Sequence, residues 1–253
     1  MELQKEITGK KIVFVHPPDL VSKHLLVYLI DREYEVYTLL DHTKVGKVHS
    51  SYPGTLFFLN IDAAMKEFEW EDFITKLQVE NPGLQLGIFS FKITEAARIQ
   101  HYIMDLGVNC GFIQLKQGVN TAANMMIKVL QANEVKGRRK YIRYQCTQET
   151  AIMNFKLDDI LINGFVQDIS SVGMSFFLEE DKELVKNQMI KNIQLRLKGV
   201  LVNTDGVVLG LRDDNGKKLY VILFNGTDQQ KTKDRVHSYI YSSLQKEFDR
   251  EFS

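Results

Sequence analysis

The pattern of apolar residues changes near residue 133, and this change limits what the chain can fold into. Before it, short β-branched apolar runs alternate with segments whose apolar residues recur at helical spacing. After it, apolar and polar residues alternate with a period of two over successive short segments, which is typical of antiparallel strands. A length of 253 residues allows two modest domains. We therefore expect an α/β domain followed by a small all-β domain.

The first half of the chain predicts strands that alternate with helices. We expect helix 94–106 to begin at Thr94 as its N-cap. Strict alternation of strands and helices favours a parallel sheet covered on both faces, the flavodoxin-like arrangement. The expected strands are 11–15, 35–40, 56–59, 86–89 and 111–115, and the expected helices are 20–30, 68–77, 94–106 and 121–131.

The second half predicts a small antiparallel barrel that ends in one helix. The sequence DDNGKK between the last two strands is a strong hairpin signal. Thr227 and Gln230 have the spacing of a capping box at the start of the terminal helix. Its apolar stripe, from Val236 to Phe248, is expected to cover a core or a partner surface. The expected strands are 150–157, 160–169, 173–178, 190–198, 201–212 and 219–224.

Two polar motifs lie near the boundary between these halves. Arg139 and Arg143 form RxxxR, and Asp168, Ser170 and Gly173 form DxSxxG. Arginine presents paired donors that match phosphate oxygens or the O6/N7 edge of guanine. An ionised aspartate accepts from the N1–H and N2–H edge of the same base, and glycine allows close approach to the backbone. The set indicates a site for an anionic, guanine-containing ligand.

With both motifs in this order, residues from about 137 to about 226 resemble the PilZ domain, the cyclic di-GMP receptor module of bacteria. The resemblance implies that Arg139 and Arg143 wrap over the ligand and contact guanine and phosphate. It assigns Asp168, Ser170 and Gly173 to the barrel surface beneath the ligand. Arg138 extends the motif to RRxxxR, which in this family is associated with an intercalated pair of cyclic di-GMP molecules, although a solvated linker charge is the alternative.

The first half resembles a response-regulator receiver domain that has lost its chemistry. Lys116 and Ser90 lie near the family's usual lysine and hydroxyl residue. The turn after the first strand reads His16-Pro17-Pro18 in place of an acidic pair, and Asn60 ends the third strand in place of the phosphoacceptor aspartate. Without paired carboxylates, the Mg²⁺ site of a receiver should not form. We expect a degenerate receiver used for contacts or scaffolding.

Composition narrows the remaining function classes. A formal net charge of zero argues against a nucleic-acid protein that works through bulk electrostatics. Two well-separated cysteines, Cys110 and Cys146, and the absence of an apolar leader or membrane-length run favour reduced thiols in the cytoplasm. The histidines lack metal-ligand spacing, and no catalytic motif is present. We therefore predict no enzyme activity, no metal and no cofactor apart from cyclic di-GMP as ligand.

These patterns divide the chain into a receiver-like domain at 1–132, a linker carrying RxxxR at 133–143, and a PilZ barrel with its C-terminal helix at 144–253. We expect the ligand to order the linker, change the orientation of the domains and so signal to a protein partner. Two alternatives stay open. One is control by phosphorylation of Asp62 in the first domain, and the other is a constitutive interaction adaptor whose barrel binds no nucleotide.

Overall fold

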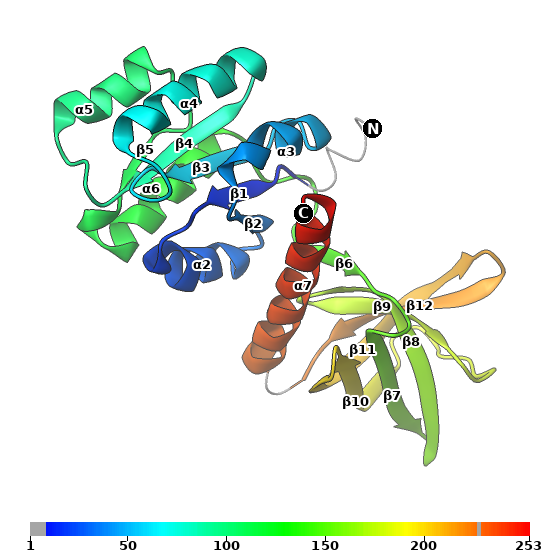
Figure 1. Cartoon of the computed structure of the whole chain (residues 1–253). Helices are drawn as coiled ribbons and strands as arrows, with labels where there is room; N and C mark the ends of the chain where they lie inside the picture. The colour runs from blue at the N-terminus through cyan, green and yellow to red at the C-terminus, as the bar shows by residue number, and fades with distance from the viewer. Residues whose placement is uncertain (1–8, 227–228) are drawn as a thin grey trace. The chain divides into compact units, whose positions relative to one another are not determined.

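The computed structural model describes residues 9–226 and 229–253, and in this part of the chain it has two compact units (Figure 1). The N-terminal unit contains the residues up to Lys140 together with Gln245–Ser253, and the second unit, the barrel unit, is Tyr141–Leu244. The end of the chain thus groups with the N-terminal unit and not with the barrel. The predicted limits of the functional domains stay a prediction.

The N-terminal unit is built on a five-stranded parallel sheet with the strand order β2-β1-β3-β4-β5. This order is that of flavodoxin-like folds, and the expected fold class is confirmed. β1 and β3 are buried along their whole length because helices cover both faces of the sheet (Figure 1). The strands are β1 Ile12–Val15, β2 Val36–Leu39, β3 Leu56–Asn60, β4 Gln85–Ser90 and β5 Phe112–Gln114.

The helices of this unit follow the predicted alternation with two exceptions. The sequence did not predict α3, a short helix in which only Val45 and Val48 are buried. Thr94 is not an N-cap, because α5 begins after Glu95 and has no side-chain cap. The helices are η1 Val21–Leu25, α2 Leu26–Ile30, η2 His42–Lys44, α3 Val45–Ser51, α4 Glu67–Glu80, α5 Ala96–Gln100, η3 His101–Asp105, η4 Leu115–Gln117 and α6 Val119–Ala132.

The barrel unit is a closed antiparallel barrel. Six strands pair in the cyclic order β8-β7-β10-β11-β12-β9, and the pairing of β9 with β8 closes the ring. β6, which the sequence did not predict, is added alongside β8. The strands are β6 Arg143–Gln145, β7 Ala151–Leu157, β8 Ile160–Ser170, β9 Gly173–Leu178, β10 Met189–Leu197, β11 Val200–Asp214 and β12 Lys217–Phe224.

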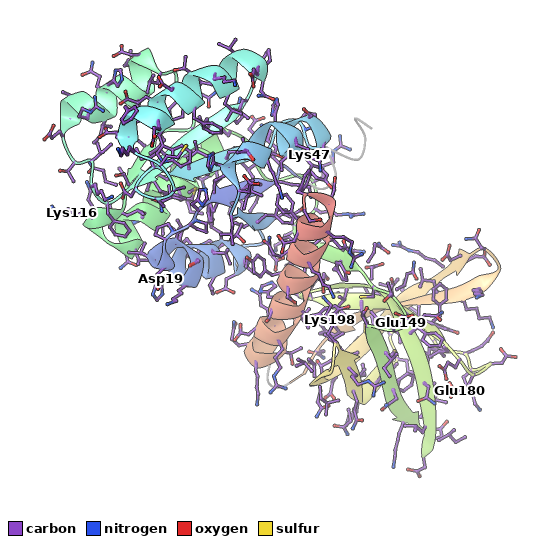
Figure 2. All side chains as sticks on the ribbon, in the orientation of Figure 1. Asp19, Lys47, Lys116, Glu149, Glu180 and Lys198 are labelled. Carbon is purple, nitrogen blue, oxygen red and sulfur yellow. The ribbon has the colours of Figure 1, made fainter. Side chains whose placement is uncertain are left out.

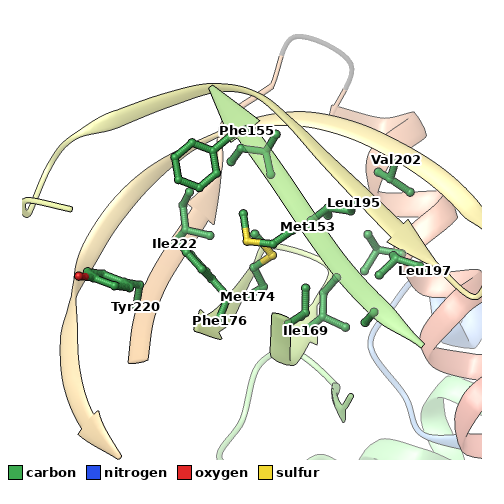
Figure 3. Packing of buried hydrophobic residues seen from close by; sticks show 14 of the residues in the cluster. Met153, Phe155, Ile169, Met174, Phe176, Leu195, Leu197, Val202, Tyr220 and Ile222 are labelled. Carbon is green, nitrogen blue, oxygen red and sulfur yellow. The ribbon is translucent and has the colours of Figure 1, made fainter. Parts of the chain in front are cut away.

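The apolar residues that alternate along the strands fill the interior of the barrel, as the sequence predicts. On β10, Ile193, Leu195 and Leu197 are buried, and the residues between them are exposed. Phe155 and Phe176 also belong to this core, whose packing Figure 3 shows. The hairpin between β11 and β12 has positive φ angles at both central residues, Asn215 and Gly216, as its sequence predicted.

Helix α7, Gln229–Glu251, contributes to both cores. Val236 and Tyr239 are buried in the core of the barrel. Further along the helix, Phe248 stacks on Tyr37 of β2 with 4.6 Å between ring centroids. The predicted apolar stripe is therefore confirmed as a core-covering surface. The predicted capping box cannot be placed, because Thr227 lies outside the described residues.

Candidate functional site on the barrel

The β8–β9 hairpin holds the three DxSxxG residues. Ser170 and Gly173 face each other as the last pair of the hairpin, and Asp168 pairs with Ser175 two residues further along the strands. The buried Ser170 hydroxyl donates to the carbonyl oxygen of Gly173 at 3.1 Å. This side chain therefore fixes the turn of the hairpin, and its implied role in the ligand site stays a prediction.

The carboxylate of Asp168 is held from two sides. Arg143 opens β6 and pairs with Ser170, so its guanidinium lies beside Asp168, with Nη1 3.3 Å from Oδ1. On the other side, the Ser175 hydroxyl donates to Oδ2. The Asp168 side chain is 15% exposed and that of Arg143 is 45% exposed, so the pair lies at the surface of the barrel. A carboxylate offers about four lone-pair sites, which leaves about two for a ligand.

Gly173 is required by the barrel itself. A Cβ at this position would lie 2.3 Å from the carbonyl oxygen of Ile222 on β12, closer than real Cβ atoms come to any atom. The sequence analysis explained this glycine by the close approach of a ligand or by a tight turn. The structure shows that the close neighbour is the backbone of the adjacent strand.

Next to Asp168, the outer surface of the barrel carries aromatic residues. Phe165 on β8 pairs with Phe177 on β9, which pairs in turn with Leu219 on β12. Both phenylalanines and Gln167 line a groove of about 830 Å³. Three lysines also line it, Lys182 after β9 and the first two residues of β12, together with four acidic residues: Glu179, Glu180, Asp181 and Asp214. The site therefore adjoins flat apolar faces, which suit planar bases, and a groove of mixed charge.

The arginines of the predicted linker separate into two groups. Arg143 is the first residue of β6, so it belongs to the barrel and not to a linker in front of it. Arg138 and Arg139 are exposed residues that group with the N-terminal unit. The structure thus brings together Arg143, Asp168, Ser170 and Gly173 among the predicted site residues. Ser175 was missed, although its place opposite Asp168 follows from the length of the hairpin turn.

The two thiols do not form a reactive site. Cys110 is buried and Cys146 is half-buried, and both are free. Burial raises the pKa of the Cys110 thiol to about 12 and that of the Cys146 thiol to about 11, so both are protonated at neutral pH.

In the N-terminal unit, other side chains occupy the position at which a receiver domain holds its metal ion. The strand order reverses between β1 and β3; His16 directly follows β1, and Asn60 ends β3. The Asn60 side chain donates to the carbonyl oxygen of His16 at 2.8 Å, and His16 Nε2 lies 3.1 Å from Nδ1 of His42. Asp19 is exposed and pairs with Lys23, and Figure 2 shows it at the surface of this unit.

Asp62, the alternative phosphate acceptor, accepts hydrogen bonds from other residues of the N-terminal unit. Its Oδ1 accepts from the Ser90 hydroxyl at 2.8 Å, and its Oδ2 accepts from the backbone N–H of Phe91 at 2.6 Å. Lys116, near the receiver's usual lysine, is exposed (Figure 2). The described residues contain no cluster of three or more His, Cys, Asp or Glu that could hold a metal ion.

Comparison with known protein families gives a match that covers the strands of the barrel. Residues 137–242 match the PilZ domain family. No curated protein matches the chain in sequence. Within the described residues, no helix has the length and apolar character needed to cross a bilayer.

Several solved structures are similar to part of the chain. YcgR from Escherichia coli in complex with c-di-GMP is 16% identical with a TM-score of 0.41, over 46% of this chain and 50% of that one. The MrkH–c-di-GMP complex from K. pneumonia is 19% identical with a TM-score of 0.39, over 46% and 57%. The Bacillus subtilis inhibitor of motility MotI/DgrA is 16% identical with a TM-score of 0.35, over 42% and 50%. Each match covers between half and about 57% of the similar protein.

Proposed function

Since residues 137–242 of this chain match the PilZ domain family, we propose that the protein is a cyclic di-GMP receptor that signals without catalysis. The observation that carries the proposal is the juxtaposition of Arg143 with Asp168 on the outer surface of the barrel. The guanidinium supplies paired donors for phosphate or the O6/N7 edge of guanine. The carboxylate supplies acceptors for the N1–H and N2–H edge. The donors of Arg143 and the acceptors of Asp168 thus suit different groups of one ligand.

Arg139 completes the proposed site from the segment that precedes β6. Its side chain is exposed, and its place in RxxxR supports this assignment. Charge-assisted hydrogen bonds contribute on the order of 1.5–3 kcal/mol each. Loss of either Arg139 or Arg143 should therefore weaken binding by about tenfold to more than a hundredfold.

Calorimetric titration of the full chain with cyclic di-GMP tests this function. Wild type should bind saturably, and Arg139→Ala and Arg143→Ala should each lose affinity in the range given above. Arg196→Ala is the matched control, because Arg196 is an exposed arginine on β10, which lies across the ring from β9. A folded wild-type protein that gives no binding, or a control that loses as much affinity as the motif variants, would refute the proposal.

Ser175 should act through Asp168. Its hydroxyl donates to Oδ2 and so fixes the orientation of the carboxylate. Ser175→Ala should weaken cyclic di-GMP binding by about three- to tenfold, the cost of one net hydrogen bond of about 1 kcal/mol. In the Asp168→Ala background the same substitution should have no further effect on affinity, because the group that it orients is gone. Additive losses in the double variant would exclude this role.

The additional arginine, Arg138, leads to a proposal about the number of cyclic di-GMP molecules that each chain binds. With RRxxxR, the site is proposed to take an intercalated pair of cyclic di-GMP molecules, with Arg138 as the additional contact. Calorimetry should then give two ligands per chain for wild type and one for Arg138→Ala. One ligand per chain for wild type would contradict the pair.

We also propose that the ligand orders the segment 133–143 and changes the orientation of the domains, so that a protein partner is recognised. The proposal is supported by the position of Arg138 and Arg139 between α6 and β6. Small-angle scattering of the full chain should change on addition of cyclic di-GMP. Superimposable profiles at saturating ligand would exclude the change of orientation while leaving the binding function intact.

A further inference from the structure

A second groove lies in the N-terminal unit, between helices α2 and α6. It has a volume of about 510 Å³, which falls in the range of small-molecule sites. Tyr28 on α2 forms one wall, residues of α6 from Asn124 to Gln131 form the other, and Arg32, Tyr34 and Lys136 also line it. None of these residues belongs to the barrel motifs.

The charge of this groove is unlike that of the chain as a whole. The whole chain has a formal net charge of zero, whereas the groove is lined by three cations, Arg32, Lys128 and Lys136. Among the described residues that line it, none is acidic, although Asp31 and Glu33 flank Arg32 in sequence. In the described part of the chain, no salt bridge neutralises any of the three. The groove is therefore a site of positive potential.

Two of the cations are held over tyrosine rings. The guanidinium carbon of Arg32 lies 3.5 Å from the centroid of the Tyr28 ring, and Arg32 Nη1 donates to the Tyr28 carbonyl at 3.3 Å. Lys136 Nζ lies 4.7 Å from the centroid of the buried Tyr34 ring. Burial raises the pKa of the Tyr34 phenol. The positive groups are thus partly ordered before any ligand arrives, which lowers the entropic cost of binding.

This arrangement selects a ligand by its chemistry. A phosphate is the anion that arginine and lysine recognise best together. A guanidinium that stacks on one aromatic ring also stacks on a planar base. The amide side chains of Asn124 and Gln131 on α6 add the donors and acceptors that the edge of a base requires. From these features we propose that the groove binds a free mononucleotide, at a site separate from the barrel.

Titration of the full chain with guanosine and adenosine monophosphates, inorganic phosphate and a short single-stranded RNA tests this site. Wild type should bind a mononucleotide more tightly than inorganic phosphate, because phosphate lacks the base. The variant Arg32→Gln/Lys136→Gln should weaken mononucleotide binding by at least about tenfold. The control Lys76→Gln/Lys116→Gln removes the same charge from exposed positions of this unit and should leave the affinity unchanged.

Four outcomes would overturn the proposal. No binding of mononucleotide to wild type at millimolar concentration, or equal binding by the groove variant, excludes the site. Competition by cyclic di-GMP would place the mononucleotide on the barrel. RNA that binds through Arg32 and Lys136 without displacement by mononucleotide would make the groove an RNA site. If thermal unfolding shows that the double variant is not folded, Lys128→Gln repeats the test with one exposed residue of α6.

Discussion

Asp168 and Gly173 show how the same motif serves both a proposed ligand and the barrel. Asp168 is oriented by Arg143 and Ser175, while Gly173 lets β12 approach the end of the hairpin. A motif that a sequence comparison attributes to binding can therefore contain residues whose immediate physical task is packing.

Substitution of two glycines of the barrel tests the packing task. Gly173→Ala places a methyl group 2.3 Å from a backbone oxygen, so β9 and β12 must move apart, and we expect a loss of about 1–3 kcal/mol in unfolding free energy. Gly210→Ala, on the neighbouring strand β11, meets no atom within 4 Å and should change stability by less than about 0.5 kcal/mol. Urea denaturation followed by circular dichroism measures both. Equal losses in the two variants would contradict the steric explanation.

At this scale the sequence predicts the chemistry of the site, which stays a prediction, but it did not predict the contacts. The residue types of RxxxR and DxSxxG were sufficient to indicate a guanine-containing anion. Ser175 was not identified, because a serine has no distinctive signal until the hairpin register places it opposite Asp168. The contact of Gly173 with Ile222 joins residues far apart in the chain, and no local pattern encodes it.

At the scale of elements, periodicity predicted the long segments and failed on the short ones. The strands and most helices were found because their buried faces repeat over several residues. β6 has three residues with one buried between two exposed, and α3 has only two buried residues in seven, so neither repeats often enough to be recognised. Thr94 was assigned as a cap from its residue type, but α5 begins one residue later than this requires.

The ends of β3 and β4 lead to a prediction about phosphorylation. Both carboxylate oxygens of Asp62 accept hydrogen bonds from the Ser90–Lys92 segment, so phosphoryl transfer would have to break these contacts. Incubation with acetyl phosphate and Mg²⁺ should leave the mass of the full chain unchanged. Asp62→Ala should instead destabilise the N-terminal unit by about 1–3 kcal/mol. A phosphoryl adduct on wild type that is absent from Asp62→Ala would support control by phosphorylation.

At the scale of the whole molecule, the last turns of α7 belong to the N-terminal unit. Phe248 and Phe252 are buried there, and Phe248 stacks on Tyr37. The predicted stripe extended to Phe248, but its division between two cores did not follow from the sequence. A periodic stripe shows that a helix buries one face, and it does not show which residues receive each part of that face.

Phe248→Ala tests this assignment. Loss of a buried phenylalanine should lower the unfolding free energy of the N-terminal unit by about 3–5 kcal/mol. Trp70 is the chain's single tryptophan and is buried in this unit, so its fluorescence during urea denaturation reports the unit selectively. Phe68→Ala is the control, because Phe68 is 58% exposed and should change stability by less than about 0.5 kcal/mol. An unchanged Trp70 transition in Phe248→Ala would contradict the assignment.

The division of α7 also bears on how the protein is made. The N-terminal unit contains Gln245–Ser253, which the ribosome adds after all of the barrel. Domains usually fold in order of synthesis, the N-terminal one first. Here the sheet of the first domain emerges early, but Tyr37 and its neighbours stay uncovered until residues 245–253 are translated. A chain that ends within the barrel would therefore lack the residues that complete its first domain.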